Sequence, residues 1–251
     1  MRAMDIHSIH VTGTDTGIGK SVASAALLHA LRAHGLRAVG MKPVASGCER
    51  TPAGWHNEDA LLLQAASDPR PEYADVNPYA FPNPLAPELA AADAGVTLTL
   101  APILAAHARL LALADTVVVE GVGGWAAPLS TTLDQSDLVH ALELPVVLVV
   151  GLRLGCINHA RLSARAIAAD GARLIGWIAN DIDPAMDRAD DNFTLLQARL
   201  PVPCWGRLPF SAPPDPQALS SRLDVRNRAI GLVAQLGLEP SPGLPAGDPT
   251  L

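Results

Sequence analysis

A glycine-rich stretch near the N-terminus, VTGTDTGIGKS at residues 11–21, constrains this chain more than any other feature. It lies between an apolar segment that predicts a strand end and an apolar segment at 22–31 that predicts a helix. In such a strand–loop–helix unit, backbone N–H groups bind phosphate, the lysine reaches the β- and γ-phosphates, and the next hydroxyl ligates Mg²⁺. Lys20 and Ser21 fit those two roles.

The spacing of the glycines departs by one residue from the usual phosphate-loop pattern. Five residues rather than four separate Gly13 from Gly19. The alternative interpretation is a glycine-rich turn that carries the Lys-Ser pair by chance. The flanking strand and helix favour the phosphate loop, because that loop requires them on either side.

Composition limits the remaining possibilities. Hydrophobic residues make up 49% of the 251 residues and aromatic residues only 4%, a mixture that suits aliphatic helices packed on a parallel sheet. The net charge of −7 argues against a general nucleic-acid binder. The apolar run at 145–150 is too short to cross a bilayer, and the first ten residues lack the apolar core of a signal peptide. We expect a cytoplasmic protein with a small substrate and no membrane contact.

The cysteines suggest neither a disulfide framework nor a zinc site. Cys48, Cys156 and Cys204 are far apart and form no C-x-x-C motif. We expect them to be small, buried or half-buried side chains.

Lysine is scarce, which makes the two lysines informative. Of the 18 cationic residues, only Lys20 and Lys42 are lysine. The broad planar guanidinium of arginine cannot replace a compact ammonium where the geometry is tight. Because Lys20 already lies in the phosphate loop, we expect a functional role for Lys42 as well. The alternative is that the two lysines remain at these positions by chance.

Segments that predict strands alternate with segments that predict helices along the chain. The predicted strands lie at 9–11, 38–42, 116–119, 146–150, 174–179 and 203–208. The predicted helices lie at 22–34, from about 57 or 59 to 66, and at 100–114, 134–142, 158–170, 188–200 and 225–236. This alternation predicts an α/β fold, a doubly wound and mostly parallel sheet with helices on both faces. We expect one domain over residues 1–236, a flexible tail at 237–251, and an irregular proline-rich excursion at 69–87.

Three oxygen-bearing side chains are candidate magnesium ligands. In open parallel sheets, ligands bind at the carboxyl ends of the strands, where the phosphate loop, Lys42 and Ser46 would lie. Glu120 ends an apolar strand and is followed by glycines, and such a buried carboxylate needs a partner, which is usually a metal ion. Ser21, Asp59 and Glu120 could ligate Mg²⁺, although an ordinary helix N-cap is an equal alternative for Asp59.

The loop at 151–158, GLRLGCIN, ends at a predicted helix N-terminus. Free backbone N–H groups there could bind a carboxylate, and a plain strand-to-helix connection is the alternative.

Taken together, these residues resemble the dethiobiotin synthetase family. The resemblance extends to about residue 216 and is carried by VTGTDTGIGKS at 11–21, KPVASG at 42–47, the N-x-D step at 57–59, VNPY at 76–79, VVVEGVGGW at 117–125, PVVLVVGLRLGCINHA at 145–160 and GWIAND at 176–181. It implies an ATP- and Mg²⁺-dependent ligase of biotin synthesis that joins 7,8-diaminononanoate and CO₂ through a carbamate and a carbamic-phosphoric anhydride. It also implies a homodimer whose active site lies near the interface.

The resemblance also assigns roles to individual residues. The catalytic residues are Lys20 and Lys42, and the magnesium ligands are Ser21, Asp59 and Glu120. The residues that contact the substrate are Ser46, Gly155, Cys156 and Asn158. The last three would contact the substrate that is bound in the partner subunit. The nucleotide-binding set is Thr16, Gly17, Ile18, Gly19, Lys20, Ser21, Val22, Asp59, Glu120, Gly121, Val122, Gly123, Asn180, Asp181, Pro209, Phe210 and Ser211.

This chain departs from the family at Gly17 and again beyond residue 216, where no family motif continues. One rival class also needs weighing. Gly17 stands where relatives often carry glutamate, so any contact of that carboxylate is missing here. The rival is a switch or partitioning ATPase, which shares the phosphate loop but acts through a protein partner. Those proteins place a second lysine early in the loop, and the corresponding residue here is Asp15.

Overall fold

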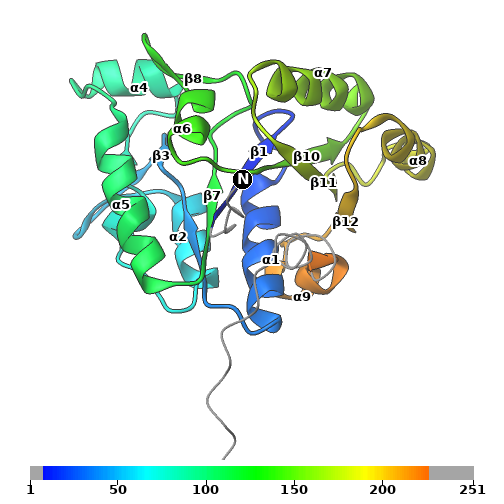
Figure 1. The fold of residues 1–251 in the computed structure, drawn as a ribbon, viewed down its shortest axis with the longest axis horizontal. Helices are drawn as coiled ribbons and strands as arrows, with labels where there is room; N and C mark the ends of the chain where they lie inside the picture. The colour runs from blue at the N-terminus through cyan, green and yellow to red at the C-terminus, as the bar shows by residue number, and fades with distance from the viewer. Residues whose placement is uncertain (1–7, 226–251) are drawn as a thin grey trace, which may run out of the picture.

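The computed structural model describes residues 8–225, which contain a central six-stranded sheet (Figure 1). Every neighbouring pair in this sheet is parallel, and the strand order is β12-β11-β10-β1-β7-β2. The strands are β1 (Ser8–Gly13), β2 (Ala38–Met41), β7 (Thr116–Glu120), β10 (Val146–Leu152), β11 (Leu174–Asp181) and β12 (Cys204–Leu208). The predicted α/β class and parallel sheet are confirmed.

Helices cover both faces of the sheet, because successive strand side chains point to opposite sides. In β10, Val147 and Val149 belong to the same apolar cluster as α1. Leu148 and Val150 face the other way and pack with α7 and α8. The first face carries α1 (Lys20–Ala33), α2 (Glu58–Ala66) and α9 (Pro216–Leu219), and the second carries α5 (Leu100–Leu113), α6 (Gln135–Ala141), α7 (Cys156–Ala169) and α8 (Ala189–Arg199).

The order of the strands places a crevice beside the phosphate loop. The chain leaves β1 through α1 to β2 on one side of the sheet, whereas β10, β11 and β12 follow on the other side. The carboxyl end of β1 therefore lies at the point where the strand order reverses. Ligands bind at this point in open parallel sheets.

The proline-rich stretch at 69–87 is more ordered than predicted. It contains α3 (Tyr73–Val76) and β6 (Tyr79–Ala80), and β6 pairs in parallel with β3 (Val44–Ala45). The prediction of an irregular excursion was wrong here, because each short element fits between the prolines and is held by tertiary contacts. The next helix, α4 (Pro87–Asp93), begins at a proline, a favourable first helical residue.

Two hairpins and several boundaries were also missed. The antiparallel pairs are β4 (Glu49–Thr51) with β5 (Gly54–His56), and β8 (Pro128–Ser130) with β9 (Leu133–Asp134). Helices α1 and α7 begin two residues earlier than predicted, and β10 extends two residues further. The predicted helix at 225–236, apart from its first residue, and the predicted tail at 237–251 lie outside the described residues.

Within residues 8–225, Cys48, Cys156 and Cys204 form no disulfide, and each is buried or half-buried as expected. Among residues 8–225, no helix has both the length and the apolar character needed to cross a membrane.

Candidate active site

The phosphate loop connects β1 to α1 through a backbone that requires glycine. Gly17 and Gly19 adopt φ angles of 72° and 80°, in the left-handed region that side chains disfavour. A Cβ on Gly19 would also collide with the side-chain amide of Asn180, which donates a hydrogen bond to the carbonyl of Ile18 at 2.9 Å. The loop is thereby fixed against β11.

Lys20 is the first residue of α1, and its side chain folds back over the loop. Its Nζ donates to the carbonyl of Asp15 at 2.8 Å, and only 6% of the residue is exposed. Burial and, to a smaller extent, the positive charge of Lys42 together lower the pKa of Lys20 to about 8. A bound anion would stabilise the charged form of Lys20, because it would place a negative charge beside the buried ammonium group.

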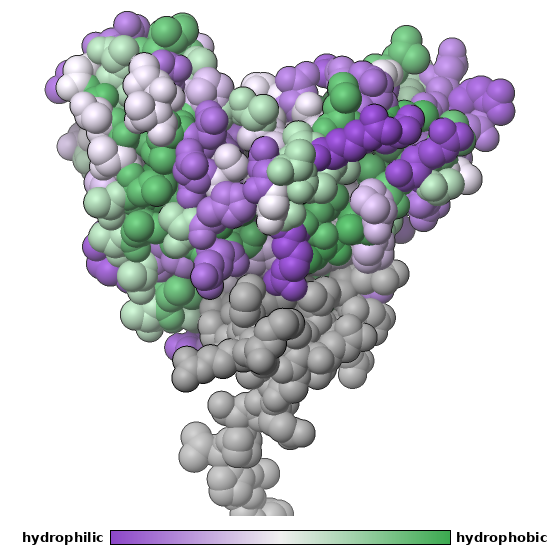
Figure 2. Space-filling view, turned by 45° about the horizontal axis from the view of Figure 1, so that its top comes forward, coloured by the Kyte–Doolittle hydropathy of each residue, from purple (hydrophilic) through white to green (hydrophobic). Residues whose placement is uncertain are grey.

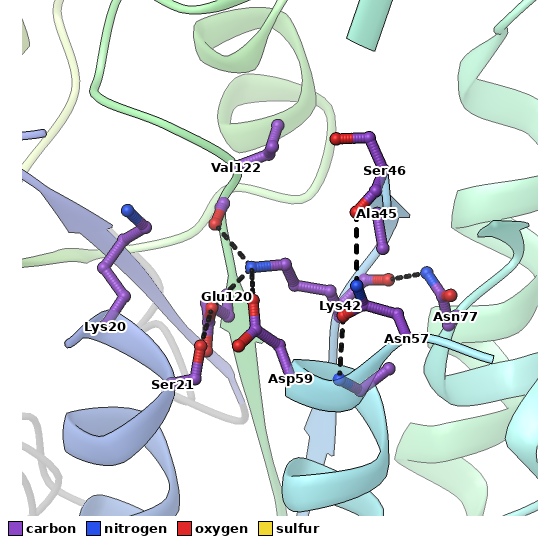
Figure 3. Close-up of polar contacts among 12 residues, drawn as sticks. Lys20, Ser21, Lys42, Ala45, Ser46, Asn57, Asp59, Asn77, Glu120 and Val122 are labelled. Carbon is purple, nitrogen blue, oxygen red and sulfur yellow. Dashed lines mark hydrogen bonds and ion pairs between the residues drawn. The ribbon is translucent and has the colours of Figure 1, made fainter. Parts of the chain in front are cut away.

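Lys42 lies between two carboxylates on the same rim (Figure 3). Its Nζ is 2.5 Å from Oε1 of Glu120 and 3.2 Å from Oδ2 of Asp59. Burial alone would lower the pKa of Lys42, but the attraction of Glu120 and then Asp59 outweighs it and raises the pKa. Lys42 is therefore a fully buried ammonium ion that stays charged.

The three predicted magnesium ligands converge. Ser21 donates a hydrogen bond to Oε1 of Glu120 at 2.8 Å, and Asp59 shares Lys42 with Glu120 (Figure 3). Burial opposes ionisation of Asp59, but Lys42, Ser21 and Lys20 outweigh it and hold the pKa below its usual value.

This donor set fits magnesium. Oε2 of Glu120 is buried and has no hydrogen-bond partner among the described residues. One hydroxyl and two carboxylates, completed by phosphate and water oxygens, match the preference of Mg²⁺ for hard oxygen ligands. Within residues 8–225, no group of three or more histidines, cysteines or acidic residues is placed to hold a metal ion.

The partner of the buried Glu120 carboxylate is a lysine. Sequence reasoning expected a metal ion to balance this charge, and the structure places the Lys42 ammonium there. A buried charge needs a counterion of either kind, so the lysine satisfies the same requirement.

Two asparagines that sequence reasoning left without a role hold this cluster in place. Asn77 donates to the backbone carbonyl of Lys42 at 2.7 Å, and the Lys42 N–H donates to Val76. Asn57 caps α2, because its side chain accepts the N–H of Ala60. Asp59 then lies in the first turn of α2 and is not the N-cap, which removes that alternative for it.

One cavity of about 1030 Å³ joins these groups. Figure 2, which tilts this end of the molecule toward the viewer, shows the surface hollowed between two lobes. The predicted residues that line the cavity are Thr16, Gly17, Gly19, Lys20, Ser21, Val22, Lys42, Ser46, Asp59, Glu120, Val122 and Gly123. Lining residues that sequence reasoning missed include Asn57, Leu62, Leu85, Gly124, Pro214 and Pro216.

Other predicted residues do not line this cavity. Ile18 is buried, and Gly121 contributes its carbonyl to Lys42 at 3.4 Å. Asp181 accepts hydrogen bonds from Arg207, while Pro209, Phe210 and Ser211 lie in an exposed loop.

The predicted substrate contacts on the α7 side also lie outside the lining. Gly155, Cys156 and Asn158 are at the start of α7, and the Cys156 residue is only 1% exposed. Their roles, like those of Asn180 and the 209–211 loop, stay predictions.

The fold and the loop define a P-loop nucleotide-binding protein. The AAA domain family model matches residues 7–218. A ParA family ATPase from Chlorobium tepidum is similar in fold, with a TM-score of 0.53 and 12% identity over 92% of this chain and 98% of that one. The MinC:MinD complex of Aquifex aeolicus is similar as well, with a TM-score of 0.52 and 14% identity over 96% and 100%. At these identities the likeness concerns the fold alone.

Relatives with similar sequences show to which family of P-loop proteins the chain belongs. The chain is 69% identical over 218 residues to an ATP-dependent dethiobiotin synthetase of Xanthomonas euvesicatoria, which covers 87% of this chain and 97% of the relative. It is 63% identical over 221 residues to the synthetase of Xylella fastidiosa, covering 88% and 98%. The chain belongs to the ATP-dependent dethiobiotin synthetase family, a family of ligases.

Proposed function

We propose that this protein forms dethiobiotin from 7,8-diaminononanoate, CO₂ and ATP, releasing ADP and phosphate, as a step of biotin biosynthesis. The observation that carries the proposal is the convergence of Lys20, Lys42 and Glu120 on one cavity. Two ammonium groups next to a phosphate loop can neutralise charge on a transferring phosphoryl group and on a carbamate.

The reaction has three balanced steps. One substrate amine attacks CO₂ and loses a proton, which gives a carbamate. A carbamate oxygen attacks the γ-phosphorus, ADP leaves, and a carbamic-phosphoric anhydride forms. The second amine then attacks the carbamoyl carbon, loses a proton and expels phosphate, which closes the cyclic urea. Positioning supplies most of the rate, because the cavity holds the amines and the phosphoryl group together.

The two lysines have different tasks in this scheme. Lys20 contacts the β- and γ-phosphates from the loop. Lys42 stabilises the carbamate and the transferring phosphoryl group, since it is buried and held in a charged state by Glu120 and Asp59. Ser46, which lines the same cavity, contacts the substrate.

Magnesium would be held by Ser21, Asp59 and Glu120. When bound, it would neutralise phosphate charge and orient the triphosphate. The loop residues Thr16 to Val22 and Gly121 to Gly123 surround the phosphates, while Asn180, Asp181 and the 209–211 loop hold the adenine.

The proposal includes a cytoplasmic homodimer with the active site near the interface. Gly155, Cys156 and Asn158 would then bind the carboxylate of the substrate in the other subunit through the N-terminus of α7.

The partitioning-ATPase alternative lacks a supporting contact in the phosphate loop. Asp15 occupies the position of the second lysine, and its carboxylate forms an ion pair with Arg153 at 2.5 Å. An anionic residue there cannot neutralise a nucleotide bound across a dimer.

Isotope labelling tests the proposal directly. The protein is incubated with ATP, Mg²⁺, 7,8-diaminononanoate and ¹³C-bicarbonate, and the product is analysed by mass spectrometry. We expect dethiobiotin that carries one ¹³C atom, in its urea carbonyl. Failure to form a labelled cyclic urea while ATP is bound would overturn the proposal.

A further inference from the structure

The loop that follows Glu120 is held by one buried glutamine. Oε1 of Gln135 accepts the N–H of Val122 at 3.0 Å. Its Nε2 donates to the carbonyl of Val122 at 2.8 Å and to that of Gly124 at 2.5 Å. Only 1% of Gln135 is exposed. Both amide protons and the amide oxygen are thus used on a single short segment of backbone.

The loop is shaped to receive this amide. A Cβ on Gly121 would collide with Oε1 of Gln135 and would lie 3.0 Å from Nε2 of His10. Gly123 adopts a φ of 63°, a backbone conformation that side chains rarely adopt. The glycines therefore permit the close approach of the Gln135 amide to the backbone.

The same loop forms one wall of the candidate active site. Val122, Gly123 and Gly124 line the cavity, and the carbonyl of Gly121 accepts Lys42 at 3.4 Å. Glu120, which directly precedes the loop, holds Lys42 and Ser21. A shift of this backbone would move the partners of the catalytic lysine.

Gln135 lies outside the cavity lining and is held in place by its own helix. It is the first residue of α6, whose N-terminus is closed by a capping box between Asp134 and Asp137. The buried residues Leu138 and Val139 fix α6 in the cluster on the opposite face of the sheet from α1. The hydrogen bonds of the Gln135 amide thus fix the backbone of the cavity wall relative to the packed helix α6.

We propose that Gln135 is a positioning residue for phosphoryl transfer, which aligns Glu120 and the Gly121 carbonyl with Lys42 through the backbone of the 121–124 loop. Gln135 does not itself line the cavity, so it acts without touching the substrate. The kinetic part of this inference rests on the proposed ligase function.

The test replaces Gln135 with methionine, which keeps the length of the side chain and removes its three hydrogen bonds. Gln64→Met is the matched control, because Gln64 is also a buried helical glutamine that donates to a backbone carbonyl, that of Pro71 at 2.9 Å. We expect Gln135→Met to lower kcat at least tenfold with less than a threefold change in the KM for ATP. The control should keep kcat within twofold while losing a similar amount in Tm.

A second measurement does not depend on turnover. Amide hydrogen exchange of the peptide at 121–126 should become at least tenfold faster at Val122 in Gln135→Met and unchanged in Gln64→Met. The Mg²⁺ concentration for half-maximal binding of a non-hydrolysable ATP analogue should rise at least threefold, because Glu120 is less well placed.

The outcomes separate the two proposals. If the wild type forms no dethiobiotin, the proposed function has failed, and exchange and the magnesium midpoint still decide the role of Gln135. Unchanged exchange at Val122, an unchanged magnesium midpoint, or an equal fall of kcat in both variants would overturn the positioning role.

Discussion

Lys42 and Glu120 meet because their strands are neighbours in register. Met41 in β2 pairs with Val119 in β7, so the next residues along both strands come level at the rim, where Nζ and Oε1 lie 2.5 Å apart. Both residues are buried, with 4% and 0% of their surfaces exposed. Removing Lys42 therefore leaves the Glu120 carboxylate without its counterion in a dry environment, whereas removing Glu120 still leaves Asp59 beside Lys42.

Replacing Lys42 with alanine should abolish most turnover while leaving ATP binding nearly intact. The lysine acts on charge that develops in the transition state, so we expect kcat to fall by about 10²-fold or more. The Kd for ATP should change only a few-fold, because the phosphate loop is untouched. Steady-state kinetics and calorimetric titration with ATP measure the two effects.

The matched control for this variant is Arg37→Ala. Arg37 lies just before β2 at the other end of the strand and is paired with Asp115 on the surface at 2.6 Å. Its removal should leave kcat unchanged. An unchanged kcat in Lys42→Ala would contradict the assigned role. Since Glu120 is left unpaired, this variant should also lose about 3–5 kcal/mol of stability, so it is assayed well below its Tm.

Replacing Ser21 with alanine should raise the Mg²⁺ requirement. The hydroxyl lies 2.8 Å from Glu120 and is the proposed ligand, so we expect the half-saturating Mg²⁺ concentration to increase about tenfold, as the loss of about 1.4 kcal/mol implies. Ser24→Ala, one turn further along α1, removes a buried hydroxyl that has no hydrogen-bond partner among the described residues. A similar magnesium shift in both variants would count against ligation by Ser21.

ATP affinity should depend on pH through Lys20. Its pKa is lowered to about 8 by burial and by Lys42, so the free protein loses this positive charge as the pH rises above 8. We expect the Kd for ATP to rise toward tenfold per pH unit between pH 8 and 9.5. In Lys42→Ala, the pH above which the Kd for ATP begins to rise should be higher, because one cause of the lowered pKa of Lys20 is gone. A Kd that stays flat up to pH 9.5 would refute this interpretation.

Replacing His10 with phenylalanine should make the protein more stable in acid. His10 is fully buried, both ring nitrogens lack partners among the described residues, and burial lowers its pKa to about 3. Between that value and about 6.5, the unfolded chain binds a proton that the native state cannot, so stability falls as the pH falls. The variant should gain about 2 kcal/mol over the wild type between pH 7 and pH 5 in urea unfolding.

A second buried histidine provides the contrast. His107 is hydrogen-bonded to Ser8 at 2.9 Å, so His107→Phe should lose stability at pH 7, where His10→Phe should not. Equal losses of stability in the two variants at pH 7 would show that the unpartnered ring nitrogens of His10 do not destabilise the native state.

Much of the site could be predicted from the sequence, because its charged residues interrupt a strong local pattern. Glu120 ends an apolar strand, Lys42 is one of two lysines, and the Gly-Lys-Ser step lies between a strand and a helix. Such residues are conspicuous because packing alone does not explain them. Their meeting at one rim followed from the parallel sheet, which the structure confirms.

The supporting residues could not be predicted. Asn77 and Gln135 bond to backbone atoms of Lys42 and of the 121–124 loop, and every residue offers such atoms, so no sequence pattern marks the pairing. The short elements within 69–87 were missed for a related reason, since tertiary contacts rather than periodicity hold them. The resemblance included VNPY at 76–79 but gave Asn77 no task.

The most direct test of the central claim is ADP release measured with ATP, 7,8-diaminononanoate and bicarbonate, each omitted in turn. The claim is that the two lysines and the magnesium ligands act on one terminal phosphate beside a carbamate. We predict that rapid ADP release requires all three components and falls to a small background when the diamine or bicarbonate is absent. ADP release at the full rate without the diamine would contradict the ligase assignment and favour a nucleotide-driven switch.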